Sequence, residues 1–183
     1  VNTELAASQV NARVRLVKIA QTQYDADGPV TSSIANFQSD ALTALYRTDD
    51  GQMDEIHALR DQAGADIVML VLNRSDAASI GLSFVLDTPA VVEPAAASIN
   101  PLYAFSVVQY STVAGTDVVP HELGHVFGCA HARGDPGATG TKDGAYTYSY
   151  GYRFFGANAQ RYHDIMAYSP GTPLSYYSNP NII

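Results

Sequence analysis

The sequence predicts a mixed α/β (α+β) fold, and three features of the chain carry this prediction. Residues 66–72 contain a continuous apolar run, which is typical of a strand in a parallel sheet that helices cover on both faces. Two earlier segments, residues 37–46 and 53–62, repeat apolar side chains at the spacing of a helix. Beyond residue 131 the chain is rich in Gly, Pro and Tyr and loses its periodicity, which predicts an irregular C-terminal part.

Local patterns predict the elements around the two helices. Residues 4–11 are expected to form a helix. In residues 14–19, Val, Leu and Ile are interleaved with Arg and Lys, which predicts a strand. Residues 25–29 combine Asp, Gly and Pro and predict a turn. Gly64 is expected to end the second helix, because glycine accepts the left-handed conformation found at helix ends.

The next part of the chain is expected to hold two more strands, residues 81–86 and 103–110, joined by a proline-rich loop over residues 87–101. A helix should follow Asp117, because aspartate is a favourable N-cap. Pro120 would then lie in the first turn, where proline is tolerated.

The most informative pattern is H-E-x-x-H-x-x-G-x-x-H over residues 121–131. His121 and His125 are four positions apart, so a helix places them on one face, about one turn from each other. His131 can join them only if the helix stops, and Gly128 is where the chain can turn back. Three converging imidazoles are the ligand set of a catalytic zinc site that leaves one position open for water. An amphipathic helix with surface histidines is the alternative, but it requires all five fixed positions to match by chance.

Glu122 follows the first ligand and is expected to be the general base. It would take a proton from the zinc-activated water and pass it to the departing amine of a cleaved peptide. Cys129 lies between two ligands and could in principle bind the metal. We expect it to be a small packed residue instead, because a free cysteine is usually buried.

A second segment, residues 164–168, reads D-I-M-A-Y. Together with the long histidine motif it resembles the metzincin clan of zinc endopeptidases, whose chain passes beneath the metal in a tight turn with a methionine. The resemblance implies that Met166 forms an apolar floor under the imidazoles without binding the metal. It also implies that Tyr168 touches the zinc or steadies the transition state, with a simply packed aromatic side chain as an equal alternative.

The resemblance further implies a twisted, mostly parallel sheet with one antiparallel edge strand. A single catalytic domain would span residues 1–183, with an upper α/β half and zinc helix in 1–131 and a smaller irregular lower half in 132–183. An extended peptide would pair with the edge strand above the metal, and residues 81–86 are the expected strand. The substrate-binding residues on it are therefore expected to be Gly81, Leu82, Ser83 and Phe84.

Within the clan, residues 150–154 (Y-G-Y-R-F), the methionine segment and residues 176–180 (Y-Y-S-N-P) look most like bacterial secreted peptidyl-Asp metalloendopeptidases. These enzymes cleave on the amino side of acidic residues. Such a preference implies a cation in the pocket for the residue after the cut. Arg153 is the first candidate for this cation. The weaker candidates are Arg161 and Lys142, which we expect to be solvated or paired with another side chain.

Composition limits the partners. A net charge of −8 and a pI near 4.8 argue against nucleic acid and anionic membranes, and leave proteins or peptides as the expected substrates. The single cysteine excludes an intrachain disulfide, and no apolar run is long enough to span a bilayer. Val1 without a preceding methionine suggests a processed product. We expect a secreted monomer, the secretion being inferred from the resemblance.

The main interpretation is therefore a secreted zinc endopeptidase with one catalytic Zn²⁺. A catalytically inactive binding module on the same scaffold is the first alternative, although the intact ligands and Glu122 speak against it. A zinc hydrolase acting on a non-peptide bond is the second. Some aspartates with neighbouring glycines could also hold calcium, although no group of them follows a known loop pattern. These are Asp25, Asp27, Asp135 and Asp143.

Overall fold

A computed structural model describes residues 1–24, 37–73, 79–86, 104–136, 144–179 and 181–182. The chain divides into two compact units. One contains residues 15–84 and 100–122, and the other contains residues 1–14, 85–99 and 123–183. The predicted turn over residues 25–29 and the predicted loop over residues 87–101 lie outside the described residues.

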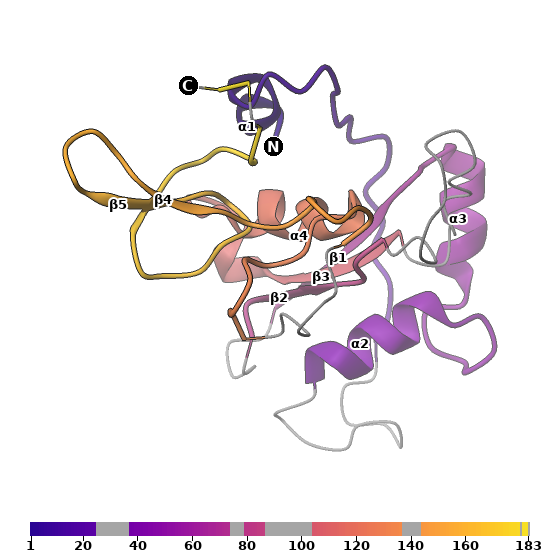
Figure 1. The fold of residues 1–183 in the computed structure, drawn as a ribbon. Coiled ribbons are helices and arrows are strands. Elements are labelled where there is room, and N and C mark those ends of the chain that lie inside the picture. Colours follow the sequence, from indigo (N-terminus) through magenta and orange to yellow (C-terminus); the bar gives the residue numbers. More distant parts are fainter. Residues whose placement is uncertain (25–36, 74–78, 87–103, 137–143, 180, 183) are drawn as a thin grey trace. The chain divides into compact units, whose positions relative to one another are not determined.

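The first unit is built on a three-stranded sheet with the order β1-β3-β2 (Figure 1). The central strand β3 (Phe105–Gln109) pairs parallel with β1 (Val68–Leu72) and antiparallel with β2 (Gly81–Ser83). All five residues of β3 are buried, as expected for a strand with neighbours on both sides. The edge strand β2 is shorter than the predicted 81–86, because the ladder ends at Ser83.

Two helices, α2 (Phe37–Tyr46) and α3 (Glu55–Ala63), pack against this sheet through one apolar core. The bounds of α2 are as predicted. Helix α3 begins two residues later than predicted, because Met53 has a φ of 57° and cannot be helical. It ends as predicted at Gly64, which takes the left-handed conformation with φ 59° and ψ 40°. The mixed α/β fold that the sequence predicts is thus confirmed.

A short 3₁₀ helix, η3 (Tyr110–Thr112), leads from β3 toward α4 (Val118–Val126), the helix of the histidine motif. Helix α4 begins directly after Asp117 and holds Pro120 in its first turn, as predicted. Among the described helices, none is both long and apolar enough to cross a membrane.

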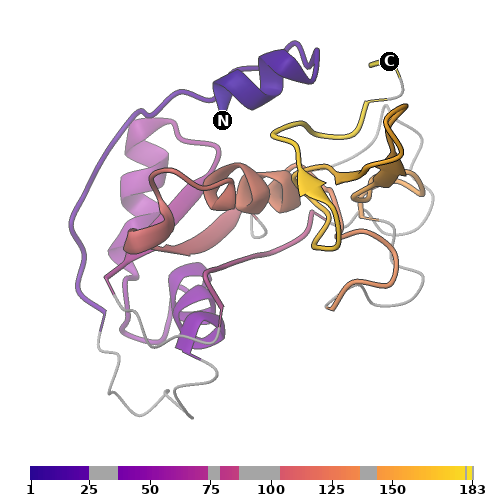
Figure 2. The same cartoon turned by 90° about the vertical axis from the view of Figure 1, so that its left-hand side faces the viewer.

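The second unit contains α1 (Asn2–Ala7) and a small sheet with the order β4-β5-β6. Its strands are β4 (Arg153–Phe155), β5 (Arg161–His163) and β6 (Thr172–Pro173). Helix α1 lies beside the C-terminal segment (Figures 1 and 2), where the Ser8 hydroxyl accepts a 2.8 Å hydrogen bond from the Tyr177 amide. The C-terminal part, predicted to be irregular, thus holds three strands that the sequence did not predict, because strands of two or three residues are too short to produce a readable period.

Two predictions near the N-terminus also need correction. Helix α1 covers residues 2–7 and not 4–11, because Gln9 has a φ of 55° and ends it. Residues 14–19 were expected to form a strand, but the structure pairs them with no strand in the described part of the chain. Leu16 and Ile19 are 75% and 83% exposed, so interleaved apolar residues alone did not create a ladder.

Candidate metal centre

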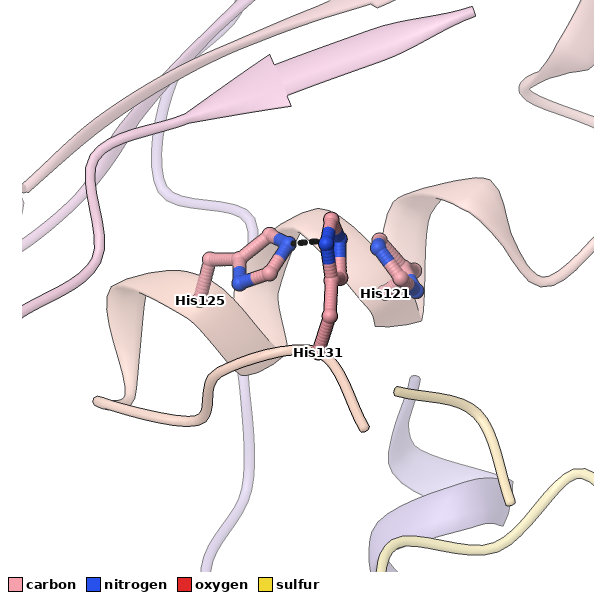
Figure 3. Close-up of side chains that lie close together, drawn as sticks. All are labelled: His121, His125 and His131. Atoms are coloured by element: carbon pink, nitrogen blue, oxygen red, sulfur yellow. Dashed lines mark hydrogen bonds between the residues drawn. The ribbon is translucent and has the colours of Figure 1, made fainter. Parts of the chain in front are cut away.

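The structure brings together the three histidines of the motif (Figure 3). His121 and His125 project from α4, one turn apart, and His131 reaches toward them from the segment that follows the helix. One ring nitrogen from each of the three lies within 4.8 Å of the other two. In the described residues, no other group of His, Cys, Asp or Glu side chains forms such a cluster.

The end of α4 explains how His131 reaches the site. The Gly128 amide donates to the His125 carbonyl at 2.8 Å, and the Cys129 amide donates to the Gly124 carbonyl at 2.9 Å. This pair of bonds is a Schellman motif, which requires a left-handed residue one place beyond the cap. Gly128 supplies it with a φ of 92°. The predicted turn at Gly128 is confirmed, and it reverses the chain before His131.

Main-chain hydrogen bonds then fix the segment that carries His131. The Ala130 amide donates to the Ser149 carbonyl at 2.8 Å, and the Gly151 amide donates to the Ala130 carbonyl at 3.0 Å. This bridge holds the residue before the third ligand against a neighbouring segment. The position of His131 therefore depends on residues 149–151 as well as on the helix end.

The donor chemistry of these rings fits a zinc ion. His125 Nδ1 lies 2.7 Å from the Cys129 carbonyl oxygen, and His131 Nδ1 lies 3.1 Å from the Pro136 carbonyl oxygen. Because a carbonyl only accepts, each Nδ1 is the donor, and a ring that is neutral then has its lone pair on Nε2. The two Nε2 atoms are 3.0 Å apart (Figure 3), so these lone pairs face each other. A cation between them removes the repulsion, and tetrahedral zinc places two ligand nitrogens roughly 3.3 Å apart.

Backbone partners on the far side of ligating imidazoles are a common feature of metal sites, because they fix the tautomer and the ring orientation. Burial also lowers the pKa of His131, which favours the neutral ring that a metal requires, although the Pro136 carbonyl and the Asp135 carboxylate act in the opposite direction.

Glu122 lies on the same helix, with 5% of its surface exposed. The Ser83 hydroxyl, on edge strand β2, donates to Glu122 Oε2 at 2.7 Å. A Cβ at Gly81, on the same strand, would clash with Oε1 of Glu122, so glycine leaves the room that this carboxylate occupies. Burial raises the pKa of Glu122 to about 7, while the hydrogen bond from Ser83 lowers it. The carboxyl group therefore titrates near neutral pH, where a general base works best.

The two other predicted substrate-binding residues, Leu82 on β2 and Phe84 directly after it, have a different environment. Leu82 and Phe84 pack against the apolar core of the first unit. Gly81 and Ser83 alternate with them and face Glu122, as the two-residue period of a strand requires.

Met166 is 2% exposed and packs against the helix between the two ligands. A Cβ at Gly124, the residue before His125, would clash with its sulfur. The turn that carries Met166 is held by Asp164, whose Oδ1 accepts from the Met166 amide at 3.1 Å and whose Oδ2 accepts from the Tyr152 amide at 2.9 Å. Burial raises the pKa of Asp164, and these hydrogen bonds lower it.

Tyr168 also reaches the histidines. Its phenolic oxygen lies 3.0 Å from His131 Nε2, and the two ring centroids are 4.5 Å apart. Tyr168 remains 41% exposed, so its ring lies over the ligand without being enclosed. The phenol is therefore placed where it could donate a hydrogen bond at the metal centre.

Arg153, the predicted cation for an acidic substrate side chain, forms an ion pair with Asp135. Its Nε also donates to the Tyr168 carbonyl at 2.9 Å. Of the weaker candidates, Arg161 is exposed and lies over the Phe155 ring, and Lys142 is outside the described residues. Local sequence patterns could not predict the pairing of Arg153, because Asp135 is 18 positions away.

Neither Cys129 nor the candidate calcium ligands join the metal cluster in the described part of the chain. Cys129 is partly buried, and burial, with the charge of Asp164 as a second cause, raises the pKa of its thiol to about 11. Among the calcium candidates, Asp135 is paired with Arg153. The other three, Asp25, Asp27 and Asp143, lie outside the described residues.

Comparisons with known proteins agree with this chemistry. A family model described as metallo-peptidase family M12 matches residues 2–178. A peptidyl-Asp metalloendopeptidase of Stenotrophomonas maltophilia (strain R551-3) is 32% identical over 179 residues, which cover 96% of this chain and 37% of the relative. One from strain K279a is 30% identical with the same coverage. One from Xanthomonas campestris pv. campestris is 31% identical over 96% of this chain and 36% of the relative. The chain thus spans a little more than a third of the length of these curated relatives.

Proposed function

We propose that this chain, which belongs to metallopeptidase family M12, is the catalytic domain of a secreted zinc endopeptidase. The observation that carries the proposal is the convergence of three imidazoles, two of them with Nε2 atoms 3.0 Å apart, together with the buried Glu122 on the helix that bears His121 and His125. In this proposal His121, His125 and His131 hold the metal, and Glu122 is the general base.

Zinc held by these ligands would polarise the peptide carbonyl and make water acidic enough to act as the nucleophile. Glu122 then accepts a proton from the attacking water and delivers it to the departing amine. Ser83 holds Oε2 of Glu122, and Gly81, which has no Cβ, leaves room for Oε1. The Tyr168 phenol donates a hydrogen bond to the oxyanion that develops at the cleaved carbonyl.

Edge strand β2 is the proposed docking element for the substrate. One edge of β2 pairs with β3, and its other edge is the outer edge of the sheet order β1-β3-β2. An extended peptide can add there as a further strand through main-chain hydrogen bonds. The packing of Leu82 and Phe84 into the core would keep this edge in place, while Gly81 and Ser83 face Glu122.

A preference for acidic residues after the cut is the finer part of the proposal. It is supported by the relatives named peptidyl-Asp metalloendopeptidases. Arg153 is the sequence-predicted cation for such a side chain, and a substrate carboxylate would have to compete with Asp135 for it. Cleavage of a mixed peptide library tests this preference. If Asp and Glu are not enriched at the position directly after the cut, the preference is refuted.

Digestion of casein by the parent, by Glu122→Gln and by Asp61→Asn tests the main proposal. Asp61 is an exposed carboxylate on α3 and serves as the matched control. We expect the parent and the control to cleave casein, with activity lost on chelation and restored by zinc. Glu122→Gln should be at least a hundredfold slower, because it cannot accept the proton. Equal rates for Glu122→Gln and the parent would refute the general base, and a zinc-loaded parent without activity would favour an inactive binding module.

A further inference from the structure

We propose that Asp135 and Arg153 form a clamp that holds the main chain of Tyr168 and thereby positions its phenol at the metal centre. The inference rests on the proposed function, because it assigns these two side chains a role in the same reaction. Both are positioning residues, since their hydrogen bonds reach the main chain of Tyr168; the charge of Asp135 also raises the pKa of the nearby His131.

The clamp holds both polar main-chain groups of one residue. Asp135 Oδ2 accepts a hydrogen bond from the Tyr168 amide at 2.9 Å. Arg153 Nε donates to the Tyr168 carbonyl oxygen at 2.9 Å. The other arms of the two side chains meet each other, since Nη2 of Arg153 pairs with Oδ1 of Asp135. One ion pair therefore encloses the peptide groups on both sides of Tyr168.

Burial makes this arrangement more than a surface ion pair. The side chains of Arg153 and Asp135 are only 14% and 6% exposed. A buried pair loses much of its hydration, and it is stable only if further hydrogen bonds occupy its remaining donors and acceptors. The amide and carbonyl of Tyr168 supply such bonds. Removal of either charge would leave its partner buried without a counter-ion.

The Tyr168 ring lies against the His131 ring and stays partly exposed. The residue is 41% exposed, whereas its neighbour Ala167 is 3% exposed and belongs to the packed turn. The phenol nevertheless sits 3.0 Å from His131 Nε2. A fixed main chain limits where this exposed ring can go, so the clamp accounts for the alignment of the phenol with the ligand.

The same turn also positions the ligand. Pro136, the residue after Asp135, provides the carbonyl that receives His131 Nδ1 at 3.1 Å. Residues 131–136 thus carry the third imidazole at their start. Near their end, Asp135 binds the main chain of Tyr168, whose phenol contacts that imidazole. A shift of this turn would move the ligand and the phenol together.

The clamp and a direct substrate contact by Arg153 make different predictions. As part of a clamp, Arg153 acts through Tyr168, so its loss lowers kcat for every peptide and leaves KM nearly unchanged. As a substrate cation, Arg153 acts on the acidic side chain, so its loss raises KM for peptides with Asp after the cut and spares those with Asn. Matched Asp and Asn peptides separate the two roles.

The test is a double-mutant cycle with Arg153→Met and Tyr168→Phe. Arg47→Met is the matched control, because Arg47 also pairs with an aspartate but at an exposed site where the partners are 50% and 74% exposed. We expect Arg153→Met to lower kcat at least tenfold in the parent, since misplacement of a catalytic group by about 1 Å can cost a hundredfold. In the Tyr168→Phe background the same change should lower kcat less than twofold. An equal loss in both backgrounds, or a loss confined to the Asp peptides, would overturn the clamp.

A second readout does not depend on activity. Tyr168 is replaced by 3-fluorotyrosine, and its ¹⁹F resonance is recorded in the metal-free protein. Arg153→Met and Asp135→Asn should shift or broaden this resonance, and Arg47→Met should leave it unchanged. If Arg153→Met does not fold, Arg153→Lys replaces it in the test. Lysine keeps the charge but lacks the planar guanidinium group, so this variant should move the resonance too. An unchanged resonance in a folded clamp variant overturns the inference, whereas an inactive parent refutes only the proposed function.

Discussion

At Glu122, burial and a hydrogen bond act on one carboxyl group in opposite directions. Burial raises the pKa to about 7, and the Ser83 hydroxyl, as a donor to the carboxylate, lowers it. A general base must be deprotonated before it can accept a proton. Ser83 would therefore keep a larger fraction of Glu122 in the deprotonated form that the proposed general base requires near neutral pH.

Replacement of Ser83 by alanine should move the acidic limb of the kcat/KM profile to higher pH. A hydrogen bond to a carboxylate contributes on the order of 1 kcal/mol, and one pH unit corresponds to about 1.4 kcal/mol, so we expect a shift of about 0.5–1 unit. Initial rates on one peptide between pH 5 and 9 measure it. Ser83→Thr keeps a hydroxyl and should retain the limb of the parent. If the acidic limb of Ser83→Ala has its midpoint at the same pH as that of the parent, or at a lower pH, Ser83 does not have this role.

The raised pKa of Glu122 also predicts how stability depends on pH. The folded chain keeps a proton up to about pH 7, whereas the unfolded chain releases it near 4.5, so ionisation of Glu122 destabilises the fold as the pH rises through this window. Glu122→Gln cannot ionise. The difference in unfolding free energy between Glu122→Gln and the parent, both metal-free, should therefore depend on pH. It should favour the variant by about 2 kcal/mol more at pH 8 than at pH 5.

Urea unfolding with a chelator, at both pH values, measures this difference. Asp61→Asn removes an exposed carboxylate and should show no comparable change between pH 5 and pH 8. A gain for Glu122→Gln that is the same at both pH values would mean that the folded environment does not disfavour the charged carboxylate.

Residues close in sequence were predictable at this site, and residues brought together from afar were not. His121, Glu122 and His125 share one helix, so their spacing alone predicted that the two histidines converge. The bond between Ser83 and Glu122 joins positions 39 apart, and the sequence suggested Ser83 only as part of a substrate-binding strand. For Asp135 the sequence suggested only calcium binding. No neighbouring residue indicated that its carboxylate accepts a hydrogen bond from the Tyr168 amide.

Among the elements, those with a complete local signal were predicted best. Helix α2 has an apolar period over its full length, and α3 and α4 end at glycines with positive φ. The predicted strand over residues 14–19 failed because a strand needs a partner for its main-chain groups, and local pattern does not supply one. The sheet of β4, β5 and β6 was missed for the opposite reason, since its pairing is clear but its strands are very short.

The end of α4 is the element-scale feature on which the ligand set depends. Gly128→Ala should lower the free energy of unfolding by about 1–2 kcal/mol, because a residue with Cβ is disfavoured at a φ of 92°. The new Cβ would also lie 2.5 Å from that of Ala145, so the segment leading to His131 must shift. We therefore expect zinc affinity to fall at least tenfold, as measured by competition with a chromogenic chelator.

Gly64→Ala is the matched control for this helix end. Gly64 also ends a helix with a positive φ of 59°, but a Cβ there would meet nothing within 4 Å. The control should lose a similar amount of stability and keep the zinc affinity of the parent. If Gly128→Ala binds zinc as tightly as Gly64→Ala, the Schellman turn does not set the position of His131.

At the scale of the whole molecule, the predicted resemblance to peptidyl-Asp metalloendopeptidases is confirmed, because relatives of that name match along 96% of the chain. The sequence predicted two halves, residues 1–131 and 132–183, but not that residues 1–14 and 123–131 group with the C-terminal part, since each unit gathers segments that are far apart in sequence. Such a division follows from long-range contacts, which hydrophobic period and turn residues do not report.

Zinc removal should destabilise the molecule as a whole. A ligand that binds only the folded chain stabilises it by about 4 kcal/mol when its free concentration is a thousandfold above Kd, so chelation should lower Tm by several degrees or more. His131→Ala removes one proposed ligand and should abolish most of this difference between zinc-loaded and chelated protein. His57→Ala, a change at a histidine that packs on Phe105 away from the cluster, should preserve it. Calorimetry of the three proteins with zinc and with chelator makes the comparison. A chelation shift in His131→Ala as large as that of the parent would show that the third imidazole does not hold the metal, because the stabilisation would then come from a different set of ligands.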